Sequence, residues 1–129
     1  MTLPLAELLL TKLQIVKLNR KDLLDAYALL LTHEVADHDE DAINAVRIGE
    51  LAARDWGLHH TIELTLERLR QGLADVDLDQ VERALVEARI DAIEVAMAAT
   101  PKTSRWRIRA RVGDRVRWYD DPDEVDGSN

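Results

Sequence analysis

Apolar side chains recur at intervals of three and four residues through most of the chain, which predicts α-helices. A first helix is expected to begin near Pro4, because proline is tolerated in the first turn of a helix. The positions that recur at helical spacing along it are Leu5, Leu8, Leu9, Lys12, Leu13 and Val16. Asn19 is a credible N-cap for a second helix, whose apolar set is Leu23, Leu24, Tyr27, Leu30 and Leu31. Because only residues 17–19 link the two helices, we expect an antiparallel helical hairpin.

The pattern changes over residues 32–41, which are polar and acidic and are predicted to form a loop. A third helix is expected from near Asn44, although Gly49 within it costs about 1 kcal/mol relative to alanine. Its apolar positions are Val46, Ile48, Leu51 and Ala52. The helix is predicted to break at residues 55–57, and a fourth helix then spans Leu58 to Leu69 with Gly72 as its C-terminal stop.

A long fifth helix is predicted after residue 77. Asp77 and Gln80 have the spacing of a capping-box variant, which places the start of the helix there. The apolar positions expected along this helix are Val81, Leu85, Ala88, Ala92, Val95 and Ala99. Pro101 ends it, because proline removes a backbone donor that a continuing helix needs.

The segment from residue 103 onward fits two structures. Apolar and arginine residues alternate strictly from Trp106 to Val112, and Gly113 with Asp114 suits a tight turn, so we favour a β-hairpin. Thr103 as an N-cap and Gly113 as a C-terminal stop would equally suit a short helix. The fold class is therefore mainly α, a bundle of about five helices, with a small C-terminal hairpin as one alternative.

Composition narrows the class of protein. The chain has 129 residues and no cysteine, which fits one domain over residues 1–119 and excludes a disulfide framework or a thiolate zinc site. No apolar run approaches the ~18 residues of a membrane span, so we expect a cytoplasmic protein that does not bind membranes. Residues 120–129 are acidic and nearly devoid of apolar side chains, so we expect a disordered tail.

Charge is strongly segregated along the chain. Residues 32–100 contain 6 basic and 16 acidic side chains, whereas residues 101–119 contain 7 basic and 1 acidic. This basic segment could bind RNA, or it could dock on the acidic middle of the same chain. The candidate RNA-binding residues, which lie near Trp106, Trp118 and Tyr119, are Arg107, Arg109, Arg111, Arg115 and Arg117. Strict alternation on a strand would put the arginines on one face and leave Trp106 to pack against the core.

Metal binding is not predicted. The acidic loop contains His33, His38 and several carboxylates, but spacing alone does not supply the geometry of a metal site. His59 and His60 are adjacent on a predicted helix and point about 100° apart, so ordinary helix positions are the better interpretation.

The stretch Leu8-Leu9-Leu10-Thr11-Lys12-Leu13 followed by Arg20-Lys21-Asp22-Leu23-Leu24-Asp25 resembles the second half of nucleotidyltransferase-like proteins of the AbiEii group. That family contains many bacterial toxin and abortive-infection enzymes. Its members show an apolar helix with a lysine, a short link, and a helix with two aspartates three residues apart. The resemblance implies that Lys12, Asp22 and Asp25 are catalytic, with Lys12 as the phosphate contact. From the residues alone, the better interpretation is structural: Lys12 is the polar edge of an amphipathic helix, Asp22 favours the helix N-terminus, and Asp25 is a solvated position.

The chain departs from the family in its missing catalytic half. A Gly-Ser turn and a strand-borne Asp-x-Asp pair hold the metals in that family, and neither precedes Lys12 here. We therefore expect no nucleotide transfer by this chain alone, and Mg²⁺ and a nucleoside triphosphate only if a partner completes the site. That partner would be an N-terminal nucleotidyltransferase half, and exposed apolar surface on the first two helices would otherwise favour a homodimer. The second hypothesis is a free-standing helical module that binds protein or RNA through residues 102–119.

Overall fold

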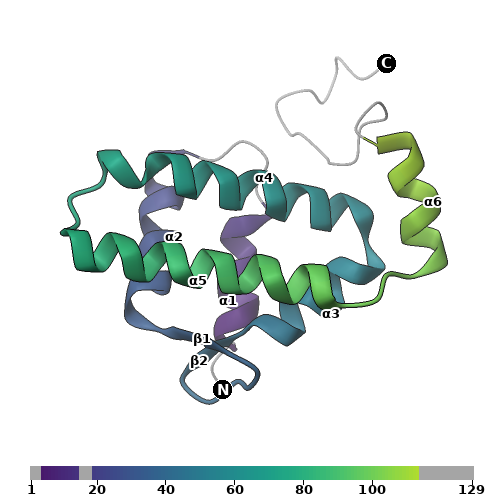
Figure 1. Cartoon of the computed structure of the whole chain (residues 1–129), viewed down its shortest axis with the longest axis horizontal. Helices are drawn as coiled ribbons and strands as arrows, with labels where there is room; N and C mark the ends of the chain where they lie inside the picture. Colours follow the sequence, from purple (N-terminus) through teal and green to yellow (C-terminus); the bar gives the residue numbers. More distant parts are fainter. Residues whose placement is uncertain (1–3, 15–18, 114–129) are drawn as a thin grey trace.

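The computed structural model describes residues 4–14 and 19–113. Over these residues the chain forms six α-helices, a short 3-10 helix and a two-stranded sheet, so the mainly α class is confirmed. α4 (Trp56–Gly72) and α5 (Gln80–Ala99) run side by side along the length of the molecule, and α1 (Leu5–Leu13) and α2 (Arg20–Thr32) cross behind them (Figure 1). Every described helix is too short or too polar to cross a lipid bilayer.

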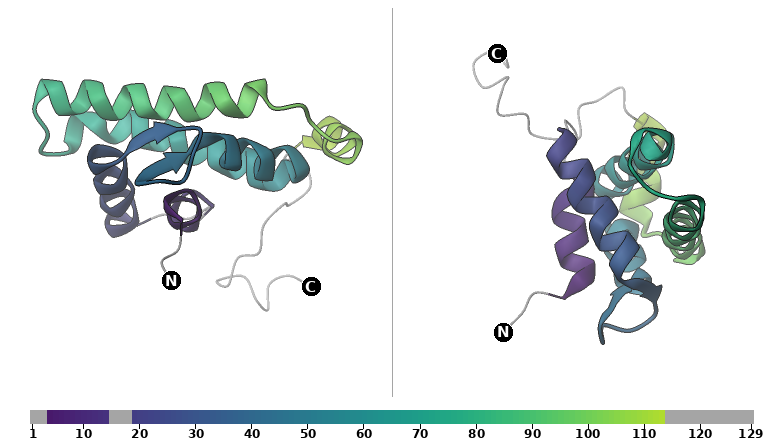
Figure 2. Two further views of the ribbon diagram at one scale, coloured as in Figure 1. Left: turned by 90° about the horizontal axis from the view of Figure 1, so that it is seen from below. Right: turned by 90° about the vertical axis from the view of Figure 1, so that its left-hand side faces the viewer.

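The predicted hairpin of the first two helices is confirmed. α1 and α2 lie side by side and run in opposite directions (Figure 2). The Asn19 side chain caps α2 by accepting a hydrogen bond from the Asp22 amide at 2.9 Å, and the Asp22 carboxylate accepts one from the Asn19 amide at 3.5 Å. This reciprocal capping box fixes the start of α2.

The expected loop over residues 32–41 is only partly correct. Thr32 is the last residue of α2, and β1 (Glu34–Ala36) pairs in parallel with β2 (Ala42–Asn44) across the short connection of residues 37–41. Asp41 adopts a positive φ of 53° there, a conformation that aspartate tolerates better than most residues. Strands of three residues are too short for an alternating pattern to reveal them, which explains the missed prediction.

Side-chain caps divide the middle of the chain as predicted. Asn44 caps α3 (Ala45–Arg54) through the Arg47 amide, and Asp55 caps α4 through the Leu58 amide. α4 therefore begins at Trp56, slightly earlier than expected. Gly72 ends α4 as predicted, and its right-handed conformation leads into the 3-10 helix η1 (Leu73–Asp75).

α5 begins later than predicted and buries a different face. Asp79 and Glu82 form its capping box, rather than Asp77 and Gln80. The residues that face the core are Val86, Ile90, Ile93 and Met97. The apolar series singled out in the sequence lies on the opposite side and is exposed along its whole length: Val81, Leu85, Ala88, Ala92, Val95 and Ala99.

The predicted C-terminal hairpin is wrong over the described residues. Ser104–Val112 form a helix, α6, whose N-terminus is capped by Thr103 through the Trp106 amide at 3.1 Å. Gly113 follows with a φ of 65°, a conformation that suits glycine after a helix end. Local capping at both ends therefore overrides the strand-like alternation, and Arg115, Arg117, Trp118 and Tyr119 lie outside the described residues.

One core joins the helices and the sheet. Its largest fully buried side chains come from α1 to α5 and β2, and they are Leu9, Leu13, Leu30, Ile43, Ile48, Ile62, Leu66, Leu69, Val86, Ile90 and Ile93. α6 contributes no buried residue and packs against the ends of α3 and α4. The basic helix is thus an appendage held at one end of the bundle (Figure 1).

Candidate functional site: a cleft of arginines and tryptophans

A cleft of about 390 Å³ lies where α6 meets the junction of α3 and α4. Its walls combine the end of α3, the first turn of α4 and the first half of α6, and its lining residues are Arg54, Asp55, Trp56, Gly57, Arg105, Trp106 and Arg109. Three guanidinium groups face one carboxylate in this lining. The cleft therefore carries a net positive charge within a protein whose net charge is -8.

α6 is held in place mainly by ring contacts. The Trp106 indole meets the His59 ring edge-on at 5.0 Å between centroids, and the Arg109 guanidinium lies 4.5 Å from the centre of the Trp56 ring. The Thr103 amide also donates a hydrogen bond to the Ala53 carbonyl oxygen at 3.2 Å. These contacts fix α6 relative to α4 without ion pairs from Arg105 to the acidic middle of the chain.

The charges on Arg54 and Arg105 are not neutralised locally. Across residues 4–14 and 19–113, neither guanidinium has a hydrogen-bond or ion-pair partner. Both side chains are exposed, and both line the cleft. Asp55 is committed to the Leu58 amide as the N-cap of α4. An anion entering the cleft would thus meet two guanidinium groups that have donors to spare.

The tryptophans supply the apolar part of the cleft. Trp56 is almost fully buried and stacks on His60 at 4.7 Å between ring centroids. Trp106 keeps its indole Nε1 buried without a hydrogen-bond partner among the described residues. A buried donor without a partner lowers the free energy of unfolding by about 1–3 kcal/mol. A ligand that brings a hydrogen-bond acceptor to the Trp106 Nε1 would recover part of that loss.

A hydrogen-bonded pair on α4, His59 and Glu63, contacts Trp106. The His59 Nδ1 lies 3.3 Å from Glu63 Oε1, and this hydrogen bond holds the pKa of Glu63 below its ordinary value. The pair contacts the outer side of Trp106 through the His59 ring. It supports the position of Trp106 rather than lining the cleft itself.

The three residues implied by the family resemblance do meet in space. Lys12 Nζ lies 3.1 Å from Asp25 Oδ2 and 3.6 Å from Asp22 Oδ1, at the end of α1 and the start of α2. The hydrogen bond with Asp25 raises the pKa of Lys12, and the same bond lowers the pKa of Asp25. Both carboxylates are therefore engaged with the lysine, and Asp22 also completes the capping box of α2. This cluster is an ion-pair network at a helix junction.

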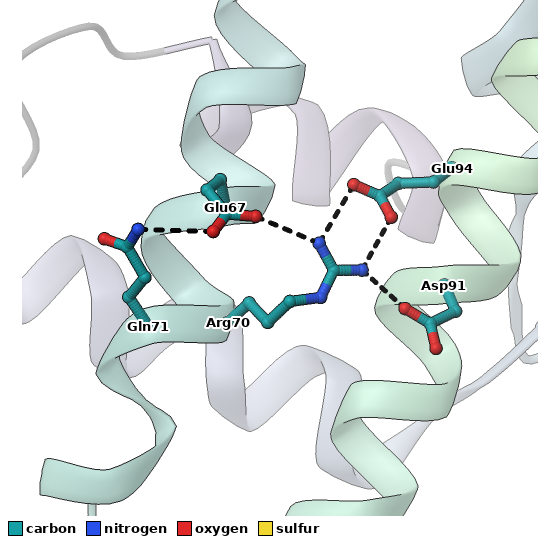
Figure 3. A network of polar contacts seen from close by, with 5 residues as sticks. All are labelled: Glu67, Arg70, Gln71, Asp91 and Glu94. Carbon is teal, nitrogen blue, oxygen red and sulfur yellow. Dashed lines mark hydrogen bonds and ion pairs between the residues drawn. The ribbon is translucent and has the colours of Figure 1, made fainter.

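A second charged network joins α4 to α5. Figure 3 shows the Arg70 guanidinium between Glu67 on its own helix and Asp91 and Glu94 on α5. The Arg70 Nη2 donates to Glu94 Oε1 at 2.6 Å, and this bond chiefly raises the pKa of Arg70. Arg70 thus pairs with three carboxylates from two helices, so the network joins α4 to α5.

No group of three or more histidine or carboxylate side chains gathers closely enough to hold a metal ion within the described ranges. His33 follows α2, Glu34 is the first residue of β1, and His38 lies in the connection between β1 and β2 with its neighbouring carboxylates. His59 and His60 contact different tryptophans, Trp106 and Trp56 respectively.

Sequence reasoning identified the α6 half of the cleft and missed the other half. Arg105 and Arg109 lie in the basic segment that the sequence singles out, whereas Arg54 and Trp56 were not identified. The available signal was the proximity of a basic residue to the predicted helix break at residues 55–57. A basic residue at a helix break does not predict a site by itself. The cleft forms only because α6, some fifty residues later in the chain, packs against this break.

Comparison of the chain with protein-family models, with curated proteins and with solved structures finds no match. The functional assignment therefore depends on the geometry and chemistry of the residues described above.

Proposed function

We propose that this protein is a helical interaction module that binds single-stranded RNA through α6 and the adjoining cleft. One observation carries the proposal: two guanidinium groups without local partners, Arg54 and Arg105, line a cleft that also contains two tryptophans. Arginine beside an aromatic ring suits single strands, because phosphates pair with the guanidinium and an unstacked base lies on the ring. Trp106 is the partly exposed ring, since Trp56 is almost fully buried and contacts His60 and Arg109.

The surrounding charge supports a localised contact. Acidic residues dominate the bundle between residues 32 and 100, so a polyanion is repelled from most of that surface and attracted to α6. Arg107 and Arg111 extend the basic surface along the exposed part of α6. The RNA backbone would follow these arginines and enter the cleft at Arg105.

The test is fluorescence anisotropy with a labelled single-stranded RNA at several salt concentrations. We expect the double variant Arg54→Ala with Arg105→Ala to weaken RNA binding at least tenfold at low salt, because two phosphate contacts are lost. Each lost contact should also reduce the slope of log affinity against log salt concentration by about 0.7. Arg20→Ala with Lys21→Ala removes the same charge from the exposed start of α2 and is expected to change affinity little.

Three outcomes would contradict this function. They are absence of RNA binding at low salt, an equal loss of affinity in both double variants, and salt-independent binding. An acidic peptide can be tested as a competitor of the RNA. If the peptide displaces the RNA and binds at least as tightly, the result would instead favour an acidic protein partner.

A second proposal follows from the Lys12 cluster and the family resemblance. We propose that α1 and α2 correspond to the C-terminal helical part of an AbiEii-like nucleotidyltransferase, with Mg²⁺ and a nucleoside triphosphate bound only when a catalytic half is supplied by a partner. The supporting observation is the meeting of Lys12 with Asp22 and Asp25 at 3.6 and 3.1 Å. Because Lys12 and the two aspartates already pair with one another, we expect no nucleotide binding by the chain alone.

Calorimetric titration with a nucleoside triphosphate and Mg²⁺ tests this second proposal. We expect no heat of binding for the chain alone, because both carboxylates already pair with Lys12. Binding that disappears in both Lys12→Ala and Asp22→Ala would contradict that expectation and indicate a working nucleotide site on α1 and α2. Equal heats in the chain and both variants would place any nucleotide site elsewhere.

A further inference from the structure

The outer face of α5 is an exposed apolar seam, defined by Val81, Leu85, Ala88, Ala92, Val95 and Ala99. Val81 is 77% exposed and Val95 is 67% exposed, although both are large apolar side chains. Figure 2 shows α5 along one edge of the molecule, opposite α1. The seam is thus a continuous apolar stripe along a helix of 20 residues, which is unusual for a surface that only water contacts.

The spacing of the seam is that of a coiled coil. Its residues follow one another at intervals of four, three, four, three and four, the alternation that keeps one stripe facing a partner helix. Ala84 and Ala98 are also exposed beside it. The acidic side chain nearest the middle of the seam is Asp91, whose charge is already paired with Arg70. Arg70 is shared with Glu67 and Glu94, so a net negative charge remains in this network beside the seam.

We propose that two copies of this chain associate through the α5 seam in an antiparallel arrangement. The seam is self-complementary about a point midway between Ala88 and Ala92. Antiparallel pairing sets Val81 of one copy against Ala99 of the other, and Leu85 against Val95. At the centre, Ala88 of each copy faces Ala92 of the other. Each end layer then combines a larger side chain with a smaller one, and the alanines at the centre allow the helix axes to approach to about 8 Å.

The size of the seam sets the strength of the contact. A helix of 20 residues is about 30 Å long, so two copies would bury on the order of 1,000 Å² in total, the lower limit for a specific interface. We therefore expect dissociation in the micromolar range. The interface is placed on α5 rather than on α1 and α2 because Val81 and Val95 are 77% and 67% exposed, more than Leu8 and Leu24 at 37% and 41%. It does not involve the RNA-binding cleft.

Sedimentation velocity across the micromolar range tests the association. We expect a monomer–dimer equilibrium for the chain, and a shift of at least tenfold toward monomer when Val81→Glu and Val95→Glu are combined. Val46→Glu is the matched control, because Val46 is 45% exposed on α3 and lies off the seam. Circular dichroism of each variant establishes that the helices remain folded, as expected for exposed positions.

Single cysteines test the direction of pairing, since the chain has none of its own. A mixture of Val81→Cys and Ala99→Cys chains treated with oxidised glutathione is expected to give a mixed disulfide dimer, and Val81→Cys alone is expected to give little. A chain that stays monomeric throughout, or a Val46→Glu variant that dissociates as readily as the seam variant, would overturn the dimer. Efficient cross-linking of Val81→Cys alone would overturn the antiparallel arrangement.

Discussion

Replacement of Gly49 by leucine is expected to lower the free energy of unfolding by about 3 kcal/mol, because α3 and α5 cross too closely at this position to admit a side chain. A Cβ added at Gly49 would lie 2.5 Å from Thr100 Oγ1 and 3.0 Å from the Ala96 carbonyl oxygen. The backbone oxygen belongs to α5 and moves only if the helix moves. Chemical denaturation followed by circular dichroism measures the loss directly.

Two companion variants make this result specific. Gly49→Ala is expected to lose less, because alanine adds only the Cβ that meets Thr100 and Ala96, whereas leucine adds three further carbon atoms. Glu50→Leu puts a leucine at the exposed neighbouring position of α3, where the change in stability is expected to stay within about 0.5 kcal/mol. If Gly49→Leu unfolded at the same denaturant concentration as the unaltered protein, the close crossing of α3 and α5 would be refuted.

Replacement of Arg89 by leucine is expected to lower the free energy of unfolding by about 2 kcal/mol, since hydrogen bonds from charged groups are worth about 1.5–3 kcal/mol. Arg89 is half-buried on α5, and its Nη1 donates to the carbonyl oxygens of Leu30 and Leu31 at 2.7 and 3.0 Å. These carbonyls are at the C-terminal end of α2, where intrahelical donors run out and positive charge is favourable. Arg89 thus joins α5 to the end of α2.

The conservative variant separates charge from geometry. Arg89→Lys keeps the positive charge but offers a point donor in place of the planar guanidinium, so we expect an intermediate loss. Arg20→Leu removes an exposed arginine from the other end of α2 and serves as the control. Thermal unfolding of all three variants gives the comparison. Equal stability of Arg89→Leu and Arg20→Leu would show that the contact with α2 contributes nothing.

The two predictions have a common cause in how the bundle is assembled. α5 contacts α2 and α3, and at both contacts a residue of one helix satisfies or fits the backbone of the other: Arg89 at the end of α2, and Gly49 against Ala96. Tyr27 gives a further case, since its hydroxyl donates to the Leu69 carbonyl oxygen at 2.6 Å and occupies the space left by Gly72. Burial raises the pKa of Tyr27 above its ordinary value, in keeping with a hydroxyl enclosed between α2 and α4.

Helix starts were largely predictable, because capping is a local interaction between a side chain and a backbone amide three residues away. Asn19, Asn44 and Thr103 all cap as their positions suggest. The start of α5 was misplaced because Asp77 and Asp79 are both good caps, and only the backbone geometry selects Asp79. β1 and β2 were missed because three residues are too few to show a period.

The candidate site was predictable in part. Lys12, Asp22 and Asp25 were expected together, since a short link between two helices brings the end of one beside the start of the next. The basic segment that forms α6 was also evident from charge alone. The cleft was not, because Arg54 and Trp56 meet Arg105 only after α6 folds back on the junction of α3 and α4.

The sequence by itself determined the mainly helical class, the boundaries that depend on local caps, and the concentration of positive charge near the C-terminus. Tertiary structure decided which side of α5 faces the core, because both sides of that helix are apolar and periodicity cannot rank them. It also decided the role of Gly49, which looks like a weak helix residue until Ala96 lies beside it. Local rules set the elements, whereas close packing between distant segments assigned their faces and formed the cleft.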